Sequence, residues 1–289
     1  MNPQGRILDG RAIAQRERAK LKQGVQQLRA QGIVPTLAAL WVGDDPASGV
    51  YFRAKEKVAR ELGIEFRGEQ WESSVSPGAV LHRIEELNRD PEVEGIFVEF
   101  PLPRQIQPED VRSAIAPEKD VDGITPVNLG KLLIEQEGLV PATPLGVVRL
   151  LIASEVSLRG AHAVMVGRSE VVGKPLALLL LNADATVTLC HSKTRDLQEH
   201  TRRADVLCVA VGRPKRITAD MVKEGAVVID IGLNSTPEGI VGDVDFERVK
   251  EKASWITPVP GGVGPMTATI VMANTIEATK RLRLGNPKV

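Results

Sequence analysis

Two side chains capable of acid–base chemistry, Tyr51 and Lys55, are four residues apart in a segment with a helical pattern. Residues at this spacing lie on the same face of a helix. A lysine side chain has an unperturbed pKa of about 10.4, so it accepts a proton near neutral pH only when burial or positive charge disfavours the ammonium form. Most lysines at such spacing are solvated, and the pair indicates a site only if other polar groups join it.

Two carboxylates are expected at comparable strand ends. Glu99 lies in the buried-strand pattern 95–100, and Asp122 belongs to Lys119-Asp120-Val121-Asp122-Gly123. An ionised carboxylate only accepts hydrogen bonds, so Asp122 could bind an amino-pyrimidine or guanidine-like group. The alternative is a turn-forming aspartate before glycine, which we prefer for Asp120. The candidate catalytic residues are therefore Tyr51, Lys55, Glu99 and Asp122.

A glycine turn follows the buried strand that ends at Val166, in the string Gly167-Arg168-Ser169-Glu170-Val171-Val172-Gly173. Such a turn lets backbone N–H groups and a helix N-terminus approach a pyrophosphate. Ser169 stands where the G-x-G-x-x-G fingerprint has its second glycine. The string therefore indicates either a dinucleotide site or a plain strand-to-helix turn.

The next strand, 186–190, is followed by His191-Ser192-Lys193-Thr194 and has no acid at its end. Folds that prefer NAD usually carry Asp or Glu there, to bind the ribose 2′-hydroxyl. Arg168 and Ser192 could instead hold a 2′-phosphate. This pattern favours NADP over NAD, and the alternative is that residues 191–193 form a solvated loop.

The most unusual string in the chain is Pro258-Val259-Pro260-Gly261-Gly262-Val263-Gly264-Pro265-Met266-Thr267. Its prolines restrict the path of the backbone, and its glycines allow backbone amides to come close to a ligand. We expect this loop to border a ligand before Thr267 starts the last helix. A purely structural role is the alternative.

The elements that would position these groups alternate between strands and helices, which is typical of parallel sheets. The segments 101–103 and 117–128 are rich in turn formers and are expected to be ordered loops. A helix 49–62 is expected to start at a Ser48 cap and to end at Gly63. The expected strands are 36–42, 64–70, 95–100, 161–166, 186–190, 206–211 and 226–231, and the other expected helices are 13–28, 76–88, 145–154, 174–181 and 267–283.

With 289 residues, the chain is long enough for two domains. We expect an α/β fold of two α/β domains flanking a cleft, the second a Rossmann-like dinucleotide-binding domain with a mostly parallel sheet. The first domain is expected at 1–140, joined by a C-terminal helix of about 267–289. The second is expected at 141–266.

Composition narrows the classes of partner. Lys plus Arg (37) equals Asp plus Glu (37), so no global field attracts nucleic acid or an anionic membrane. Cys190 and Cys208 provide neither a disulfide framework nor a zinc cluster, and no metal is expected. The segment 1–11 has no apolar signal-peptide core, and no apolar run reaches the roughly 20 residues of a bilayer span. These features predict a cytoplasmic protein.

Taken together, these strings resemble the bifunctional methylenetetrahydrofolate dehydrogenase/methenyltetrahydrofolate cyclohydrolase family, in order and over nearly the whole chain. The matching segments are Val42 to Ser48 with Tyr51 and Lys55, Pro101 to Pro103, Lys119 to Gly123, Val166 to Pro175, Cys190 to Ser192, Gly242 to Val244 and Thr257 to Thr267.

The resemblance implies a folate in the cleft, a folate-binding catalytic first domain and an NADP-binding second domain. It makes Lys55 the main catalytic residue of hydrolysis, places Tyr51 beside the pterin and lets Asp122 bond the pterin ring. The implied NADP contacts are Gly167, Arg168, Ser169, Ser192 and Leu233, the last in place of a common isoleucine. The implied substrate contacts are Tyr51, Lys55, Val98, Glu99, Phe100, Asp122, Pro260, Gly261, Gly262, Val263, Gly264, Pro265, Met266 and Thr267.

The implied activity is NADP-dependent oxidation of 5,10-methylenetetrahydrofolate to 5,10-methenyltetrahydrofolate, followed by hydrolysis to 10-formyltetrahydrofolate. This is one-carbon metabolism, with a link to purine biosynthesis, and the family also implies a homodimer. Hydride transfer needs mainly orientation of the two ligands, because the folate nitrogens stabilise the cation. Hydrolysis needs proton handling, for which Lys55 is the expected residue.

One departure from the family bears on that second step. The family usually has Gln where this chain has Glu99, before Pro101-Leu102-Pro103. A glutamate favours the ammonium form of Lys55, unless Glu99 is itself protonated or serves as the base. One alternative is therefore a dehydrogenase with weak or absent hydrolysis. Two further alternatives, independent of Glu99, are an amino-acid or shikimate-type dehydrogenase and a nucleotide-sensing protein without activity.

Overall fold

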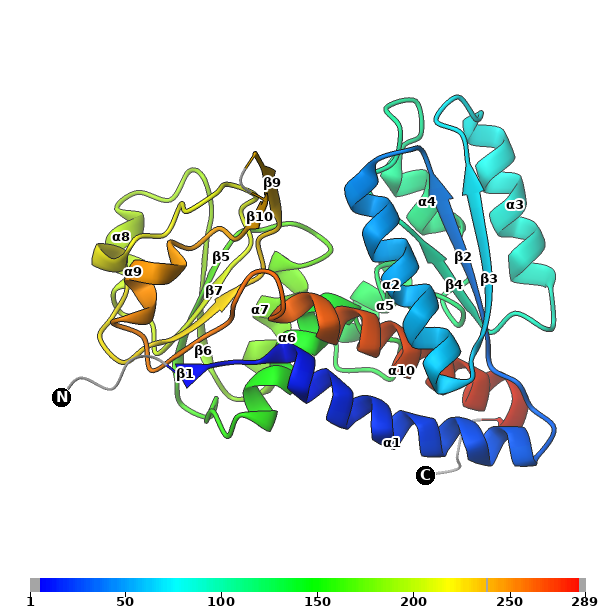
Figure 1. The fold of residues 1–289 in the computed structure, drawn as a ribbon, viewed down its shortest axis with the longest axis horizontal. Coiled ribbons are helices and arrows are strands. Elements are labelled where there is room, and N and C mark those ends of the chain that lie inside the picture. The colour runs from blue at the N-terminus through cyan, green and yellow to red at the C-terminus, as the bar shows by residue number, and fades with distance from the viewer. Residues whose placement is uncertain (1–5, 238, 286–289) are drawn as a thin grey trace. The chain divides into compact units, whose positions relative to one another are not determined.

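The computed structural model describes residues 6–237 and 239–285, which fold as two compact units (Figure 1). We call them the six-strand unit, residues 6–15 and 143–267, and the three-strand unit, residues 16–142 and 268–285. Residues 6–15 were expected in the first domain and belong instead to the six-strand unit. The reason is that β1 (Arg6–Ile7) pairs with β11 (Trp255–Ile256).

The six-strand unit is built on a parallel sheet with the strand order β1-β11-β8-β7-β5-β6. An antiparallel hairpin of β9 and β10 lies outside this sheet. The expected α/β class with a mostly parallel sheet is confirmed. The remaining elements of the unit are β5 (His162–Val166), α7 (Gly173–Asn182), β6 (Thr186–Cys190), α8 (Leu197–Thr201), β7 (Val206–Val209), a 3₁₀ turn (Ala219–Met221), β8 (Val227–Asp230), β9 (Asn234–Thr236), β10 (Gly239–Val241) and α9 (Phe246–Lys250).

The order of these strands creates a topological switch point. From β5 the chain crosses to β6 on one side of the sheet and then to β7 on the other side. The loops after β5 and β7 therefore diverge at the carboxyl ends of the strands. Open α/β sheets bind their ligands in this crevice.

The three-strand unit contains the parallel sheet β3-β2-β4. On one face, α3 and α4 bury an aliphatic core that includes Leu40 and Ile84. Helix α2 covers the other face (Figure 1), and the ring of its Phe52 lies 5.8 Å from that of Trp41. The elements of the unit are β2 (Thr36–Val42), α2 (Pro46–Leu62), β3 (Glu65–Trp71), α3 (Pro77–Arg89), β4 (Gly95–Val98), α4 (Pro108–Ala114) and α5 (Pro126–Leu133).

Three helices pass from one unit to the other: α1 (Gly10–Ala30), α6 (Ala142–Ala153) and α10 (Val263–Leu284). Helix α10 begins at Val263, four residues before the expected Thr267. Pro265 is accommodated because a proline in the first turn removes no helical hydrogen bond. Within the three-strand unit, Arg18 Nε of α1 donates to Thr269 Oγ1 of α10 at 2.9 Å.

The helix that carries Tyr51 and Lys55 begins earlier than expected. Asp45, not Ser48, caps it, and Ser48 donates both its N–H and its hydroxyl to the Asp45 carboxylate at 2.8 Å. Pro46 occupies the first turn, where its fixed φ suits the helix. The C-terminal glycine is confirmed, since Gly63 is left-handed with φ of 82°. Helix α5 likewise begins inside the expected loop 117–128.

The core beneath α3 gives a stability prediction. Ile84 is fully buried there, so Ile84→Ala is expected to lower the free energy of unfolding by about 2–5 kcal/mol. The same change at Ile134, which is 61% exposed, should cost less than about 0.5 kcal/mol. Urea denaturation of both variants tests this, and equal losses would contradict it.

Candidate active site

Lys55 and Glu99 form a buried ion pair in the three-strand unit. Side chains alternate along a strand, so Phe97 and Glu99, at the end of β4, point to the same face, the one covered by α2. Lys55 Nζ lies 2.8 Å from Glu99 Oε2 and 4.4 Å from the centre of the Phe97 ring. Both charged side chains are only 8% exposed. The amine is therefore fixed between a carboxylate and an aromatic face.

Two opposing effects act on the pKa of the Glu99 carboxyl in this pair. Burial raises the pKa of Glu99, while the Lys55 ammonium acts in the opposite direction. In a site of low polarity, the two groups stay charged only because they compensate each other. Because its pKa is raised, the Glu99 carboxylate, with the Lys55 amine beside it, is suited to accept a proton from a bound water.

Tyr51 lies one helical turn before Lys55 on α2 and is half-buried. Burial raises the pKa of its phenol, and the negative charge of Glu99 raises it further. The hydroxyl therefore stays protonated and can donate a hydrogen bond. The structure brings Tyr51 to the Lys55–Glu99 pair, as the sequence spacing predicted.

The loop that carries Asp122 is organised by Asp120, which is fully buried. The Asp120 carboxylate accepts from Gly123 N at 2.9 Å, Thr125 N at 2.8 Å and Asn128 Nδ2 at 2.9 Å. Gly123 has φ of +70°, and an added Cβ would lie 2.4 Å from the Val140 backbone. Asp120 is thus the turn-forming aspartate that the sequence indicated.

Asp122 has a carboxyl that forms no hydrogen bond or ion pair with any residue of 6–237 or 239–285. Its side chain keeps partial solvent exposure. Its pKa is raised to about 7, chiefly by burial and also by the negative charges of Asp120 and Glu99, while the positive charge of Lys55 acts in the opposite direction. An unpaired carboxyl beside an ion pair is suited to accept N–H groups from a ligand.

The neighbours of Glu99 point elsewhere. Val98 is buried on the opposite face of β4, in the core formed with α3, and Phe100 packs partly against the same core. Their side chains therefore support the sheet. Any contact of Val98 with a ligand would have to come from its backbone.

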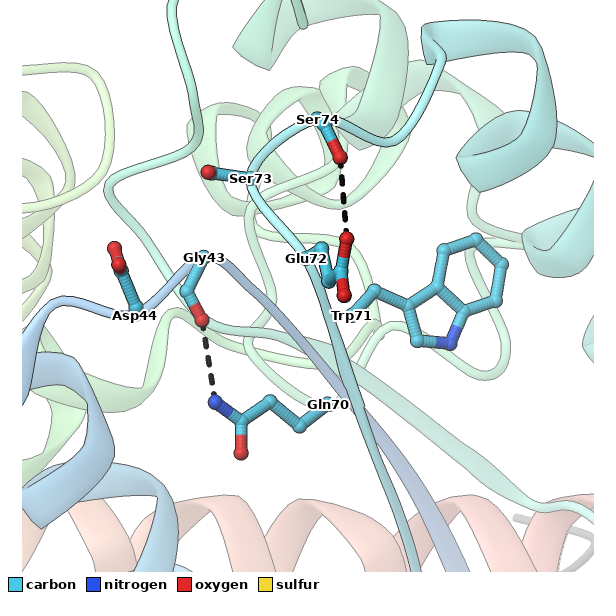
Figure 2. Close-up of a pocket in the computed structure, with 7 residues that line it drawn as sticks. All are labelled: Gly43, Asp44, Gln70, Trp71, Glu72, Ser73 and Ser74. Carbon is cyan, nitrogen blue, oxygen red and sulfur yellow. Dashed lines mark hydrogen bonds between the residues drawn. The ribbon is translucent and has the colours of Figure 1, made fainter.

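A surface pocket of about 380 Å³ lies at the carboxyl ends of β2 and β3. Figure 2 shows Gln70 reaching the Gly43 carbonyl across the two strands, and Ser74 donating to Glu72. Asp44 and Glu72 give its lining a negative charge, and Lys55, Glu99 and Asp122 do not line it. The pocket is therefore separate from the group of side chains around Lys55.

The turn after β5 has the shape expected for a dinucleotide. Gly167 has φ of +125°, and an added Cβ would lie 2.1 Å from the Ala210 carbonyl, at the switch point. The backbone N–H groups of Arg168 and Ser169 have no partner among the described residues. The Ser169 hydroxyl accepts from Val172 N and Gly173 N, at the start of α7. Two free amides and the Arg168 guanidinium thus fit a phosphate-bearing cofactor.

The other cofactor residues lie at the same edge of the sheet. Gly167 N donates to Cys190 O at 2.9 Å, which brings the end of β6, and the exposed Ser192 after it, beside the glycine turn. Leu233 follows β8 and is 45% exposed. No acid follows β6 directly, so the chemistry of this edge matches a 2′-phosphate.

The proline-glycine segment is only partly a loop. Pro260, Gly261 and Gly262 precede α10, and Gly262 N donates to Pro258 O at 2.8 Å. Val263, Gly264, Pro265, Met266 and Thr267 form the first turns of α10, which corrects the expected loop. The side chains of Val263 and Met266 are buried in the core of the six-strand unit, so they do not face a ligand.

Sequence reasoning missed three groups. Phe97 was read only as part of a buried strand, although the alternation that places Glu99 beside α2 also places Phe97 there. Asp230 and Asp243 are buried carboxylates in the six-strand unit, and only the string around Asp243 was noticed. In the described part of the chain, no three His, Cys, Asp or Glu side chains are grouped to hold a metal ion.

Two family models match the chain. Residues 8–122 match the catalytic domain of the tetrahydrofolate dehydrogenase/cyclohydrolase family, and residues 141–283 match the NAD(P)-binding domain of that family. The bifunctional protein FolD of Bacillus subtilis (strain 168) is 50% identical over 276 residues, which cover 95% of this chain and 98% of the relative.

Solved structures are similar over the same extent. The bifunctional enzyme FolD, methylenetetrahydrofolate dehydrogenase/cyclohydrolase, from Campylobacter jejuni is 45% identical with a TM-score of 0.92, covering 95% of this chain and 98% of that chain. The methylenetetrahydrofolate dehydrogenase-cyclohydrolase of Trypanosoma brucei, solved with NADP and an inhibitor, is 37% identical with a TM-score of 0.92, covering 96% and 98%. These similarities extend through both units.

Proposed function

The chain belongs to the tetrahydrofolate dehydrogenase/cyclohydrolase family, and on this premise we propose that it oxidises 5,10-methylenetetrahydrofolate with NADP and hydrolyses the methenyl product to 10-formyltetrahydrofolate. The observation that carries the proposal is the buried Lys55–Glu99 pair beside the unpaired carboxyl of Asp122. The relatives named above are bifunctional, so they lend no support to a dehydrogenase that lacks hydrolysis.

For the oxidation, the protein supplies binding and orientation. The bound cofactor would supply a hydride acceptor for the methylene carbon, and the folate nitrogens would stabilise the cation that remains. No net proton is released in this step, so no side chain has to act as a base. The residues of both units then contribute mainly by holding the two ligands in a reactive arrangement.

For the hydrolysis, the Lys55–Glu99 pair handles the proton. Water adds to the methenyl carbon, the bond from that carbon to the ring nitrogen N5 breaks, and one proton is released overall. The attacking water becomes a better nucleophile when the pair accepts its proton. Lys55 and Glu99, fixed at 2.8 Å from each other, can receive it and pass it to the departing nitrogen or to solvent.

Pterin recognition falls to Asp122 and Tyr51. The ionised Asp122 carboxylate has only acceptors, which suit the amino group and ring N–H of a pterin. The half-buried Tyr51 supplies a ring surface and a protonated hydroxyl beside the same pair. Pro260, Gly261, Gly262, Gly264, Pro265 and Thr267 are proposed as further contacts of the ligands.

The cofactor residues are Gly167, Arg168, Ser169, Ser192 and Leu233. The first three offer the turn and its free amides, and Arg168 with Ser192 would bind the 2′-phosphate. Leu233, exposed after β8, would border a ring of the dinucleotide. The missing acid after β6 supports NADP over NAD.

This assignment predicts the effect of Arg168→Ala. The variant is expected to raise the KM for NADP by about tenfold or more and to leave the KM for NAD nearly unchanged, because only NADP carries the 2′-phosphate. Arg159→Ala removes an exposed arginine from the loop before β5 and serves as the control. Equal effects on both cofactors would contradict the role of Arg168.

One coupled assay tests the function itself. NADP reduction with 5,10-methylenetetrahydrofolate should be followed by decay of the methenyl absorbance faster than in buffer. Reduction without faster decay would indicate the monofunctional enzyme. Cofactor binding without any reduction would indicate a nucleotide sensor, and reduction with shikimate instead would overturn the substrate.

We also propose a homodimer in the cytoplasm, supplying 10-formyltetrahydrofolate for purine biosynthesis. The edge strand β6 carries the exposed Leu189, and the unpaired backbone groups of a sheet edge can pair with a second copy of the chain. Light scattering should then give twice the chain mass of 31.3 kDa. Both cysteines are buried free thiols, which fits a reducing compartment. In residues 6–237 and 239–285, no helix has the length and apolar character needed to cross a bilayer.

A further inference from the structure

Two buried carboxylates in the six-strand unit have no place in the chemistry above. Asp230 ends β8 and Asp243 follows β10, and they are 3% and 0% exposed. Neither forms an ion pair with a Lys, Arg or His side chain in the described ranges. Burying unpaired carboxylates is costly, so their hydrogen bonds must compensate.

Asp243 uses its full accepting capacity. It accepts from the backbone N–H groups of Val211 at 2.6 Å, Gly212 at 2.9 Å and Arg213 at 2.8 Å. It also accepts from Asn234 Nδ2 at 2.8 Å. A carboxylate has about four accepting positions, so its anion is saturated here. One side chain thus holds the loop after β7 together with the start of β9.

Asp230 in turn holds Asp243. It accepts from Gly232 N and Asp243 N at 3.0 Å and from Val244 N at 2.9 Å. Burial raises the pKa of Asp230 to about 7, against these hydrogen bonds. Glycines make room for the arrangement: an added Cβ would lie 2.2 Å from the Asp243 carboxyl at Gly232, and 1.8 Å from the Asp230 carboxyl at Gly242.

The loops held in this way border the switch point. Loop 211–213 follows β7, whose neighbour β5 ends at the glycine turn, and Gly167 packs on the Ala210 carbonyl. Leu233 lies between two residues that are held by hydrogen bonds. Gly232 N donates to the Asp230 carboxylate, and Asn234 Nδ2 donates to the Asp243 carboxylate. An exposed leucine is therefore fixed from both sides at the carboxyl edge of the sheet.

We infer that Asp243 is a positioning residue of the cofactor site. It fixes loop 211–213 directly and the backbone beside Leu233 through Asn234, in the conformation that binds a nicotinamide dinucleotide. This inference rests on the proposed function and extends it to residues that do not touch the cofactor. Asp230 supports the arrangement by anchoring the backbone at Asp243 itself.

The charge and the number of acceptors are both essential to this role. Asn in place of Asp243 would keep one accepting oxygen and turn an NH₂ group toward backbone N–H donors. Hydrogen bonds would be lost and donors would face each other, so loop 211–213 would have to move. Asp243→Asn is expected to raise the Kd for NADP by about tenfold, with the KM for folate changed by less than about twofold.

Calorimetric titration of NADP into the full-length protein tests the inference without relying on turnover. The matched control is Asp205→Asn, which removes the ion pair to Lys223 and the charge on the acceptor of the His162 N–H, at the amino ends of the strands. Both variants should lose melting temperature, and only Asp243→Asn should lose NADP affinity. A folded Asp243→Asn that binds NADP within twofold of wild type would overturn the inference.

A milder variant tests the inference if Asp243→Asn does not fold. Asn234→Ala removes the Asn234 Nδ2 donor, the one side-chain donor to Asp243 in the described part of the chain, and is expected to raise the Kd for NADP by about threefold. Unchanged affinity in Asn234→Ala would then overturn the inference. If the wild-type protein itself does not bind NADP, the proposed function fails instead.

Discussion

Lys55→Arg is expected to slow hydrolysis of methenyltetrahydrofolate by about 10²- to 10⁴-fold, the range typical for loss of a positioned proton-transfer group. NADP reduction should stay within about tenfold of wild type, because hydride transfer needs no base. An arginine preserves the positive charge beside Glu99, yet its guanidinium does not release a proton at accessible pH. The variant therefore separates charge pairing from proton transfer.

Lys55→Met makes the complementary change. It leaves the Glu99 carboxylate buried without a cation, and removal of one partner from a buried pair typically costs about 3–5 kcal/mol. Glu99 is then expected to take up a proton, so hydrolysis should fall as far as in Lys55→Arg while unfolding occurs more easily. If Lys55→Arg and Lys55→Met differ in stability but lose hydrolysis to the same extent, the loss comes from the missing proton transfer by Lys55 and not from unfolding.

The control for both variants is Lys57→Met, which removes an exposed lysine from the same helix. It should leave both activities and the melting temperature close to wild type. Decay of the methenyl absorbance and NADP reduction are measured on the same preparations. Full hydrolysis in Lys55→Arg would contradict a role for Lys55 in proton transfer and would leave that role to Glu99.

The elements that carry these side chains could largely be predicted from the sequence. The strands 36–42 and 186–190 were placed at their observed ends. The first is an almost continuous apolar run between turn formers and is buried throughout, as is characteristic of a central parallel strand. The second alternates threonine with apolar residues and is largely accessible, because it lies at the edge of its sheet. The spacing of Tyr51 and Lys55 gave a shared helix face. Glu99 lies 2.8 Å from Lys55, whereas the expected effect of its charge on hydrolysis stays a prediction.

The errors have a common physical origin in competition between local signals and tertiary contacts. Asp45 and Ser48 are both good N-caps, and the presence of Pro46 decides for Asp45. Pro265 reads as a helix breaker, but a first-turn position tolerates it. Strand β1 has only two residues, too few for a recognisable pattern. It is a strand only because it pairs with β11, which lies near the other end of the chain and which local sequence does not reveal.

Asp122 gives the second large effect, a dependence of folate binding on pH. The KM for 5,10-methylenetetrahydrofolate is expected to rise as pH falls below about 7, by up to about tenfold per pH unit. The pKa of Asp122 is raised to about 7, so the carboxyl is ionised above this pH and protonated below it. A protonated carboxyl turns an O–H donor toward the N–H donors of a pterin, whereas the ionised form accepts from both.

Asp122→Asn is expected to abolish this pH dependence and to raise the KM at pH 8 by about 10²-fold, the effect of opposing a donor to a donor in a partly buried site. The kcat should change less, because the oxidation itself uses no base. KM and kcat measured from pH 5.5 to 8.5 separate these effects. An inflection that persists in Asp122→Asn would assign the titration to another group.

Glu99 should set the position of the inflection. Its negative charge raises the pKa of Asp122, and its pairing with Lys55 offsets the cation that would lower it. Glu99→Gln removes the first effect and leaves the Lys55 ammonium uncompensated, so both changes favour the ionised form of Asp122. The inflection in KM is therefore expected to move to lower pH, while Glu56→Gln, which removes a carboxylate paired with Arg60 on the same helix, should leave it in place. A shift to higher pH in Glu99→Gln would mean that Lys55 and Asp122 do not share one electrostatic site.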